Sequence, residues 1–270
     1  MPLISVIVNV DSRPENDNNQ EMFKGCVSRD FLIEGLINKR QLFNGFDFEL
    51  ICFLDEHEPV DESTIAGMRL LCDTLIIRKH NKKFEGQDDF AGFNDLNYIQ
   101  AISQARGKYI FKFDGDVAAF TSSKEPIQEY IDLLEKYDYV SYPSMWSPEP
   151  VHDESFQGKY WASTRFFCCK RTTFDITELI KCQIDFEYWK ETYPMARLCH
   201  WLEHTTASIA WNKGKGVYYP PVDFGRIIIY TWGTYSKYTL RRLNNQTFEE
   251  VRDWVYRQNY HYPNDITIIN

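Results

Sequence analysis

Residues 101–116 read AISQARGKYIFKFDGD, and this stretch indicates the fold more clearly than any other part of the chain. Apolar side chains recur at helical spacing up to Gly107, and residues 108–113 then have the composition of a buried strand. The tripeptide Asp-Gly-Asp at 114–116 follows without a break. A helix that leads into a buried strand, with acids where that strand ends, is typical of a βαβ unit in a parallel sheet.

The same alternation of strand and helix precedes this stretch. Buried-strand patterns occupy residues 3–10 and 48–54, a shorter one lies at 74–77, and helical patterns fall between them at 23–32 and 65–72. Strand and helix thus alternate four times within about 115 residues. This order predicts a three-layer α/β/α fold with a mainly parallel central sheet and right-handed crossovers.

Beyond residue 116 the pattern is looser. A helix is expected after Ser123, and strands are expected at 139–142 and 165–169. A last amphipathic helix begins at Thr247, where Glu250 completes a capping box.

No repeat, low-complexity tract or linker divides the 270 residues. We therefore expect one domain at residues 1–238, formed by halves 1–120 and 121–238, with a C-terminal helical appendage at 239–270. All seven tryptophans lie in the second half of the chain, which suggests that the two halves have different tasks.

The charge and the cysteines restrict the class of protein. A formal net charge of −9 argues against nucleic acid or an anionic membrane as the main partner. The seven cysteines contain no C-x-x-C pair and are expected to be buried free thiols in a reducing compartment. No apolar run approaches the ~18 residues of a membrane span. We expect a cytoplasmic protein, and we leave peripheral attachment to a membrane open.

Acidic side chains follow the predicted strands. Asp11 comes after the first strand, Asp55 after the second, and Asp114 and Asp116 after the strand at 108–113. Open parallel sheets bind ligands at the carboxyl ends of their strands, so we expect these acids at one edge. Carboxylates there could accept hydrogen bonds from a ribose or hold a hard cation that bridges two phosphates. The alternative for each of them is a solvated turn.

Three chain segments, in this order, resemble the nucleotide-sugar half of the GT-A glycosyltransferases, in particular the large inverting family 2. They are ISVIVNV at 4–10, FELICFLDE at 48–56 and AISQARGKYIFKFDGD at 101–116. The resemblance covers residues 3–120 well and 121–235 loosely. The sequence signatures of P-loop enzymes, Rossmann dehydrogenases and α/β-hydrolases are absent.

The resemblance implies a metal-dependent transferase that moves a sugar from a nucleoside diphosphate to an acceptor hydroxyl. Asp11, Arg13 and Asp55 would contact the nucleotide, Asp114 would serve both ribose and metal, and Asp116 would hold the Mn or Mg ion. The donor would be a UDP- or GDP-sugar bound by the first half of the domain. The acceptor would be a saccharide, a glycolipid or another hydroxyl compound bound by the second half.

The resemblance also implies an acidic base in the second half. Glu203, in the segment LCHWLEH, occupies the matching place, and Asp153, Glu154 and Asp185 are reserves. Inverting transfer needs one base in line with the anomeric carbon, opposite the leaving diphosphate. We expect inversion, and the sequence leaves retention open. The alternative for Glu203 is an ordinary carboxylate on a helix face.

A rival motif overlaps this segment, because residues 200–204 match H-x-x-E-H, the zinc signature of inverted metallopeptidases. That family takes a third, glutamate ligand far downstream, and only Glu249 and Glu250 remain, in a predicted capped helix. The peptidase hypothesis also leaves the strand-end acids unexplained. His204 could instead contact metal or phosphate in a transferase. A further alternative is an inactive carbohydrate-binding relative of the transferases.

The aromatic second half suits an acceptor site, since aromatic faces stack on sugars. Trp201 is one candidate for this role, although most of the tryptophans are expected in the core. Residues 230–242 combine Gly233 with the cations Lys237, Arg241 and Arg242. This stretch could form a lid whose cation reaches the diphosphate, and a solvated basic turn is the alternative.

Overall fold

The computed structural model describes residues 2–12, 29–56, 59–79, 99–115, 117–141, 166–173, 175–192, 209, 217–218, 227–231, 237–259 and 266–269. Its contacts divide the chain into two compact units, each made of separate stretches of sequence. The first unit comprises Met1–Ile7, Asn81–Phe113 and Tyr130–Pro220, and the second comprises Val8–His80, Asp114–Glu129 and Pro221–Asn270. The first strand of the fold contributes its first half to one unit and its second half to the other.

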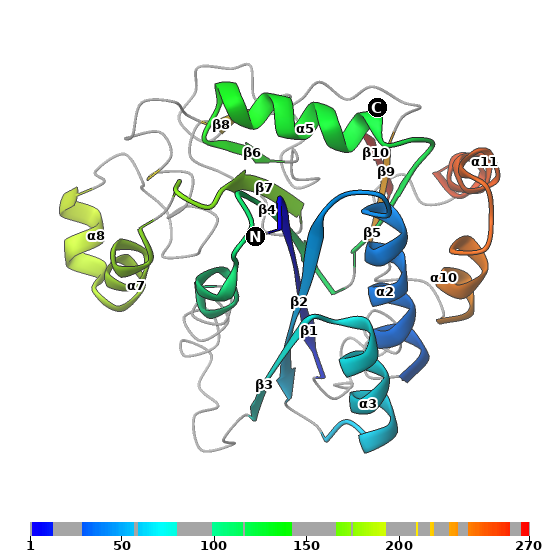
Figure 1. Cartoon of the computed structure of the whole chain (residues 1–270), viewed down its shortest axis with the longest axis horizontal. Helices are drawn as coiled ribbons and strands as arrows, with labels where there is room; N and C mark the ends of the chain where they lie inside the picture. The colour runs from blue at the N-terminus through cyan, green and yellow to red at the C-terminus, as the bar shows by residue number, and fades with distance from the viewer. Residues whose placement is uncertain are drawn as a thin grey trace. The chain divides into compact units, whose positions relative to one another are not determined.

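The second unit begins with the predicted alternation of strands and helices. The strands β1 (Ile4–Asp11), β2 (Phe48–Glu56) and β3 (Thr74–Lys79) lie in the order β3-β2-β1. Strands β2 and β3 are parallel, and the arrow of β1 points the same way (Figure 1). The middle residues of β2 are all buried, as its continuous apolar run predicts.

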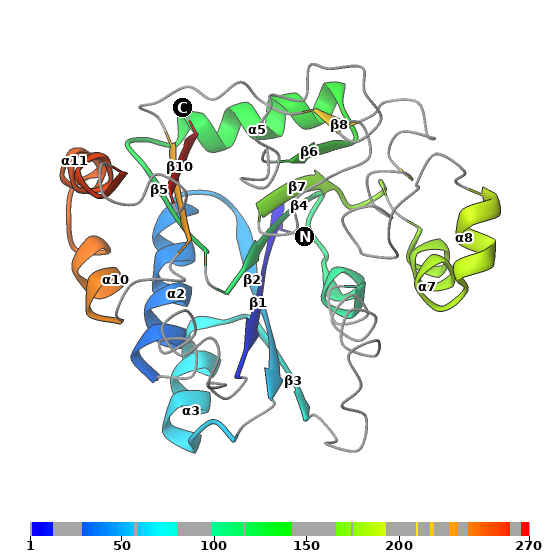
Figure 2. The ribbon, with the colours of Figure 1, turned by 180° about the vertical axis from the view of Figure 1, so that it is seen from behind.

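Two helices cover one face of these strands. They are α2 (Arg29–Leu42) and α3 (Glu62–Leu71), and Figures 1 and 2 show them side by side. Helix α3 begins after Asp61, whose carboxylate accepts a hydrogen bond from the Thr64 backbone N–H at 2.9 Å. Its inner face is formed by Ile65 and Met68, at the spacing that the sequence shows.

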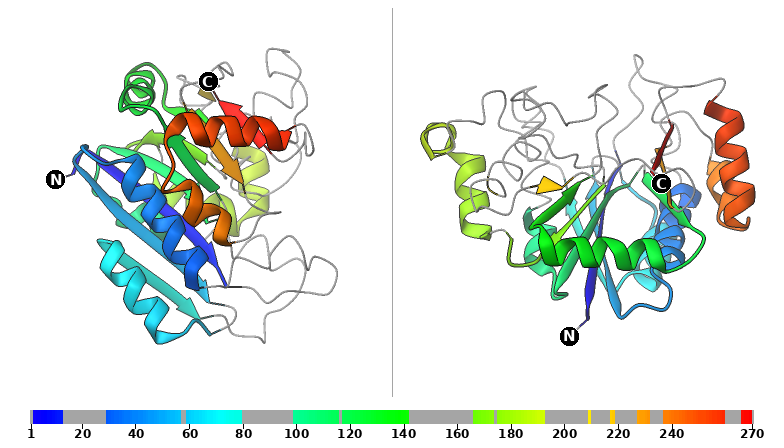
Figure 3. Two further views of the ribbon diagram at one scale, coloured as in Figure 1. Left: turned by 90° about the vertical axis from the view of Figure 1, so that its right-hand side faces the viewer. Right: turned by 90° about the horizontal axis from the view of Figure 1, so that it is seen from above.

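A second, antiparallel sheet in the same unit was not predicted. Its order is β10-β9-β5, with β5 at Val117–Thr121, β9 at Ile227–Thr231 and β10 at Ile266–Ile269. The helices α10 (Lys237–Leu243) and α11 (Phe248–Asn259) belong to this unit as well (Figure 3).

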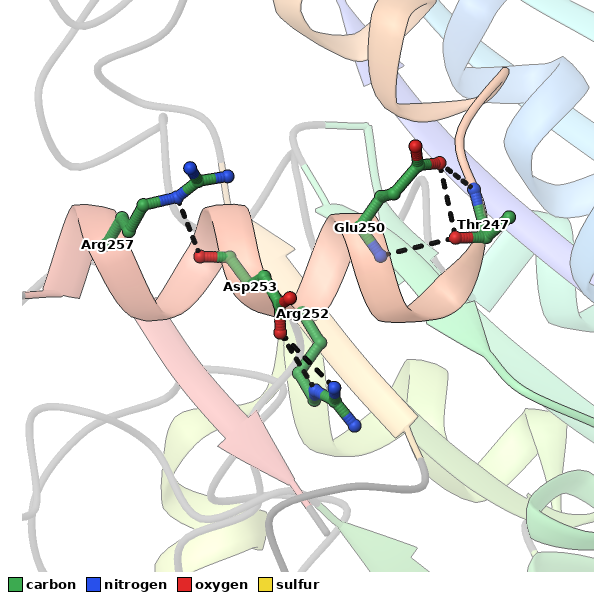
Figure 4. Close-up of polar contacts among 5 residues, drawn as sticks. All are labelled: Thr247, Glu250, Arg252, Asp253 and Arg257. Atoms are coloured by element: carbon green, nitrogen blue, oxygen red, sulfur yellow. Dashed lines mark hydrogen bonds and ion pairs between the residues drawn. The ribbon is translucent and has the colours of Figure 1, made fainter.

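The predicted capping box of α11 is confirmed (Figure 4). The Thr247 N–H donates to Glu250 Oε2 at 2.8 Å, and the Glu250 N–H donates to Thr247 Oγ1 at 3.3 Å. The two residues therefore satisfy each other's backbone groups where the helix begins.

The first unit contains strands in the order β1-β4-β7-β6-β8. They are β4 (Tyr109–Asp114), β7 (Phe166–Lys170), β6 (Tyr139–Ser141) and β8 (Val217–Tyr218). Strand β7 is antiparallel to both β4 and β6, whereas β6 and β8 are parallel. Helices α5 (Glu125–Lys136), α7 (Ile176–Ile184) and α8 (Phe186–Thr192) are also described, and residues 99–104 are helical as the sequence predicts.

An aromatic cluster fills the core of the first unit. Phe113 and Phe166 have ring centroids 4.9 Å apart, and the Tyr130 ring meets Phe166 edge-on at 5.5 Å. These side chains are almost completely buried. Burial of such rings gives ~1.5–3 kcal/mol each, so the cluster anchors α5 on β4 and β7.

The mixed α/β fold with a mostly parallel central sheet is therefore confirmed. No helix within the described ranges is long and apolar enough to cross a membrane. The domain limits at 238 and 239 stay a prediction. Residues 239–270 include strand β10 in addition to helices.

Candidate functional site

The ends of β1 and β2 are joined directly. The backbone N–H of Ser12 donates to the carbonyl oxygen of Asp55 at 3.0 Å. Ser12 is fully buried and Asp55 is 4% exposed, so this contact lies inside the second unit. Asp11 is the last residue of β1, immediately before Ser12. The backbones of the acids at the ends of the first two strands therefore lie close together, as the sequence predicts.

The turn after β4 lies against the end of β1. Asp114 is the last residue of β4 and is partly exposed. A Cβ added to the next residue, Gly115, would lie 2.7 Å from Val10 Cγ1 and 2.8 Å from the Asn9 carbonyl oxygen. Glycine is thus required here by close approach of two backbones. Asp116 lies outside the described residues.

Asn9 is a candidate site residue that the sequence analysis did not identify. Its Oδ1 atom is buried and accepts no hydrogen bond from the residues that the structure describes. A buried amide oxygen without a partner destabilises the fold by ~1–3 kcal/mol, so a bound ligand that donates to it would recover that energy. The available signal was a single amide inside the apolar run at 4–10.

The donor atoms at this edge fit a hard cation or the hydroxyl groups of a nucleotide. Asp55 and Asp114 provide carboxylate oxygens, and Asn9 provides a buried amide oxygen. Mg²⁺ and Mn²⁺ prefer such oxygen ligands to thiols. Among the described residues, no three acidic, histidine or cysteine side chains form a group that could hold a metal ion.

The second acid of the Asp55-Glu56 pair has a structural role. Glu56 pairs with Lys79 of β3 at 3.9 Å, and its Oε1 accepts from the Val60 N–H at 3.1 Å. Strand register places Glu56 opposite Lys79 and Asp55 opposite Arg78. Glu56 therefore holds the segment that follows β2, which leaves Asp55 as the acid of this pair to be considered for ligand binding.

Several other predicted site residues fall outside the described residues. These are Arg13, Asp153, Glu154, Trp201, Glu203 and His204, and with them the whole H-x-x-E-H motif. Lys237 begins α10, and its side chain is not described. Asp185, a reserve for the base, lies between α7 and α8 and accepts from the Tyr188 N–H at 2.9 Å. That contact is an ordinary helix cap.

The lid interpretation of residues 230–242 stays a prediction, and the two described cations of this stretch contact residues of their own unit. Arg241 Nε donates to the buried Glu34 carboxylate at 2.7 Å, and Arg242 stacks over the Trp254 ring at 5.3 Å. Residues 227–231 form β9, which pairs on both sides with other strands. These cations bind parts of their own unit, because a carboxylate on α2 and a ring on α11 lie within their reach.

The prediction of buried thiols is confirmed for four of the five described cysteines. Cys52, Cys168, Cys169 and Cys182 are buried and form no disulfide among the described residues, and Cys72 is partly exposed. Burial raises the pKa of Cys168 and of Cys169, and it raises the pKa of Cys182 to about 12. These thiols remain protonated at neutral pH and suit the core.

Comparison with known proteins finds similarity to solved structures and no similarity of sequence to a family or a curated protein. No protein-family model matches the chain, and no curated protein matches it. The galactosyltransferase LgtC, in complex with donor and acceptor sugar analogues, is 11% identical with a TM-score of 0.48, over 80% of this chain and 72% of that one. A cytidylyltransferase from Leptospira borgpetersenii is 12% identical with a TM-score of 0.43, over 83% and 77%.

A third similar structure is the mannosyltransferase PcManGT from Pyrobaculum calidifontis, in complex with GDP-Man and Mn²⁺. It is 13% identical with a TM-score of 0.43, over 82% of this chain and 55% of that one. The structural neighbours thus include sugar transferases that bind nucleotide sugars.

Proposed function

We propose that this protein is a metal-dependent glycosyltransferase that moves a sugar from a nucleoside diphosphate to an acceptor hydroxyl with inversion. The observation that supports this most strongly is the joining of three strand ends that carry acids. Ser12 binds Asp55 through the backbone, and Gly115 packs on Asn9 and Val10. Asp11, Asp55 and Asp114 are thereby brought to one edge of the second unit.

In this proposal each strand end has its own task. Asp114 and Asp116 hold a Mg or Mn ion, which when bound neutralises the negative charge of the diphosphate. Asp11, Arg13 and Asp55 bind the nucleoside, and Asn9 accepts a hydrogen bond from it. A UDP- or GDP-sugar is the proposed donor.

The transfer itself is assigned to Glu203. Its carboxylate accepts the proton of the acceptor hydroxyl, whose oxygen forms a bond to the anomeric carbon while the bond to the diphosphate breaks. A saccharide, a glycolipid or another hydroxyl compound is the acceptor, and Trp201, His204 and Lys237 are proposed to surround it or the phosphates. This assignment extends the resemblance of the segment at 198–204.

The proposal is tested by donor hydrolysis and transfer assays with UDP- and GDP-sugars in the presence of Mn²⁺. We expect Asp116→Ala to abolish turnover and donor binding while the protein stays folded. Glu203→Gln is expected to lose turnover and to keep donor binding, since it changes only the base. Full activity of Asp116→Ala with Mn²⁺ would contradict the metal assignment. Stoichiometric zinc without nucleotide binding would favour the peptidase instead.

A further inference from the structure

Lys39 lies inside the second unit, on helix α2, and its side chain is completely buried. Its ammonium group donates to the carbonyl oxygen of Val117 and to Asn38 Oδ1, the latter at 3.4 Å. Lysine is almost never fully buried unless its ammonium group is paired or hydrogen-bonded, because removing an ammonium from water is very unfavourable. A lysine in this place therefore calls for a reason beyond packing.

Val117 is the first residue after the Asp-Gly-Asp turn and begins β5. The turn is thus held at two points within the second unit. Before Asp116, Gly115 packs on Asn9 and Val10 of β1. After Asp116, the Val117 carbonyl is held by Lys39. Gly115 and Val117, which flank Asp116 in the sequence, are therefore both held by contacts within the second unit.

The residue beside Lys39 strengthens this attachment. Asn38 Nδ2 donates to the Ala119 carbonyl at 3.1 Å, and Asn38 Oδ1 accepts from the Ala119 N–H at 2.9 Å. One side-chain amide therefore satisfies both backbone groups of a residue in β5. On its other side β5 pairs with β9, with Ala119 opposite Ile229. Helix α2 thus supports β5 along the edge that strand pairing leaves open.

We propose that Lys39 is a positioning residue for the metal-binding turn. By holding the Val117 carbonyl, it fixes the place of the turn at 114–116 and so sets the affinity for a divalent cation and, with it, a nucleoside diphosphate. This inference rests on the proposed function. It concerns a side chain that binds the backbone directly after the acids.

The charge of Lys39 and its bond to the turn have opposite effects on the affinity for Mn²⁺, which makes the inference testable. A buried ammonium near the turn repels a cation, so removal of its charge alone would strengthen Mn²⁺ binding. If Lys39 acts through the turn, its removal weakens Mn²⁺ binding. Lys39→Met keeps an unbranched side chain and removes both the charge and the donor. The direction of the change separates the two roles.

Lys124→Met is the matched control. Lys124 also donates to a backbone carbonyl of the second unit, that of Gly45 at 3.0 Å, and lies over the Phe46 ring. This contact is exposed and is not part of the Asp-Gly-Asp turn. The same chemical change is therefore made at a different carbonyl.

The experiment is a Mn²⁺ titration of the full chain by electron paramagnetic resonance, followed by UDP and GDP titrations at saturating Mn²⁺. We expect Lys39→Met to weaken Mn²⁺ binding roughly tenfold and Lys124→Met to leave it unchanged. If the wild-type protein binds Mn²⁺ and Lys39→Met binds it equally or more tightly, the role of Lys39 is overturned. The proposed function is not affected by that result. Absence of Mn²⁺-dependent nucleotide binding by the wild-type protein overturns the proposed function as well.

A second measurement needs no variant and covers the case in which Lys39→Met does not fold. Coupling between sites is reciprocal, so a ligand that orders the turn must protect the groups that hold it. We expect Mg²⁺ with nucleoside diphosphate to slow amide hydrogen exchange of residues 117–121 in the wild-type protein. Protection confined to other segments would contradict the role of Lys39.

Discussion

The backbone N–H of Ser12 donates to the carbonyl oxygen of Asp55 at 3.0 Å and so joins the ends of two strands that are 43 positions apart in sequence. A single hydrogen bond of this kind contributes only ~0.5–1.5 kcal/mol to stability. Its value for function is geometric, because it fixes Asp55 beside the residue that follows Asp11. The packing of Gly115 on Val10 then adds the end of β4 to the same edge.

Gly115→Ala is expected to lower the free energy of unfolding by about 1–3 kcal/mol. The added Cβ would meet the Asn9 carbonyl oxygen at 2.8 Å, and backbone atoms cannot move aside easily. Urea denaturation measures the effect. Gly35→Ala is the control, since its Cβ would lie 3.8 Å from the Gly115 oxygen, an ordinary contact.

Gly35 lies inside α2, where alanine is favoured over glycine by up to ~1 kcal/mol. We therefore expect Gly35→Ala to leave stability unchanged or raise it. Equal effects of the two substitutions would show that close approach is not what requires Gly115.

Thr247→Ala is expected to lower stability by about 1 kcal/mol, because it removes the side-chain oxygen that caps α11. Glu250→Gln should have a smaller effect, since the amide can still accept from the Thr247 N–H shown in Figure 4. Thermal unfolding of both variants and of Glu249→Gln, an acid of the same turn outside the capping box, provides the comparison. A loss as large for Glu249→Gln as for Thr247→Ala would argue against the box.

Glu135→Gln is expected to reduce the acid sensitivity of the protein. Lys108 donates to the Glu135 carboxylate at 2.8 Å, and this hydrogen bond, together with one from Tyr109, lowers the pKa of Glu135 to about 2. A lowered carboxyl pKa stabilises the fold above the unfolded pKa of about 4.5, and that contribution is lost as the pH falls towards 2.

The melting temperatures of the wild-type protein and Glu135→Gln should therefore converge between pH 6 and pH 2.5. The pair is half exposed, so added salt should also narrow the difference. A difference that stays constant over this pH range would show that Glu135 contributes nothing through its charge.

Thiol reactivity tests the burial of the cysteines. In a Cys26→Ser/Cys199→Ser background, we expect Cys72 alone to react quickly with a disulfide reagent at neutral pH, because the other four are buried. A hydrogen bond between the Cys52 and Cys72 side chains, and then burial, raise the pKa of Cys52. Addition of Cys72→Ser should remove the fast phase, and a second fast thiol in the native protein would contradict the described core.

The parallel part of the fold could be predicted from the sequence because the patterns that indicate its strands and helices are local. Strand β2 is a continuous apolar run, and α3 carries its apolar residues at helical spacing after the cap Asp61. The acids at the ends of β1 and β2 could be placed together by the rule that parallel strands end at one edge.

The antiparallel sheet and the buried polar groups depend on distant residues. Strand β5 pairs with β9 more than a hundred positions away, and such pairing leaves no short-range pattern. Lys39 reads as a surface lysine of an amphipathic helix, and its contact with the Val117 carbonyl can be seen only in the fold. Arg241 likewise reads as a free cation until Glu34 is placed beside it.

The most direct test of the account is calorimetric titration of UDP and GDP into the wild-type protein and Asp114→Asn, with and without Mn²⁺. We predict binding of at least one nucleoside diphosphate that depends on Mn²⁺ and is weakened roughly tenfold or more in Asp114→Asn, which keeps the shape of the side chain and removes its charge. Absence of Mn²⁺-dependent binding by the wild-type protein, or equal binding by Asp114→Asn, would contradict the assignment of this strand edge as a donor site.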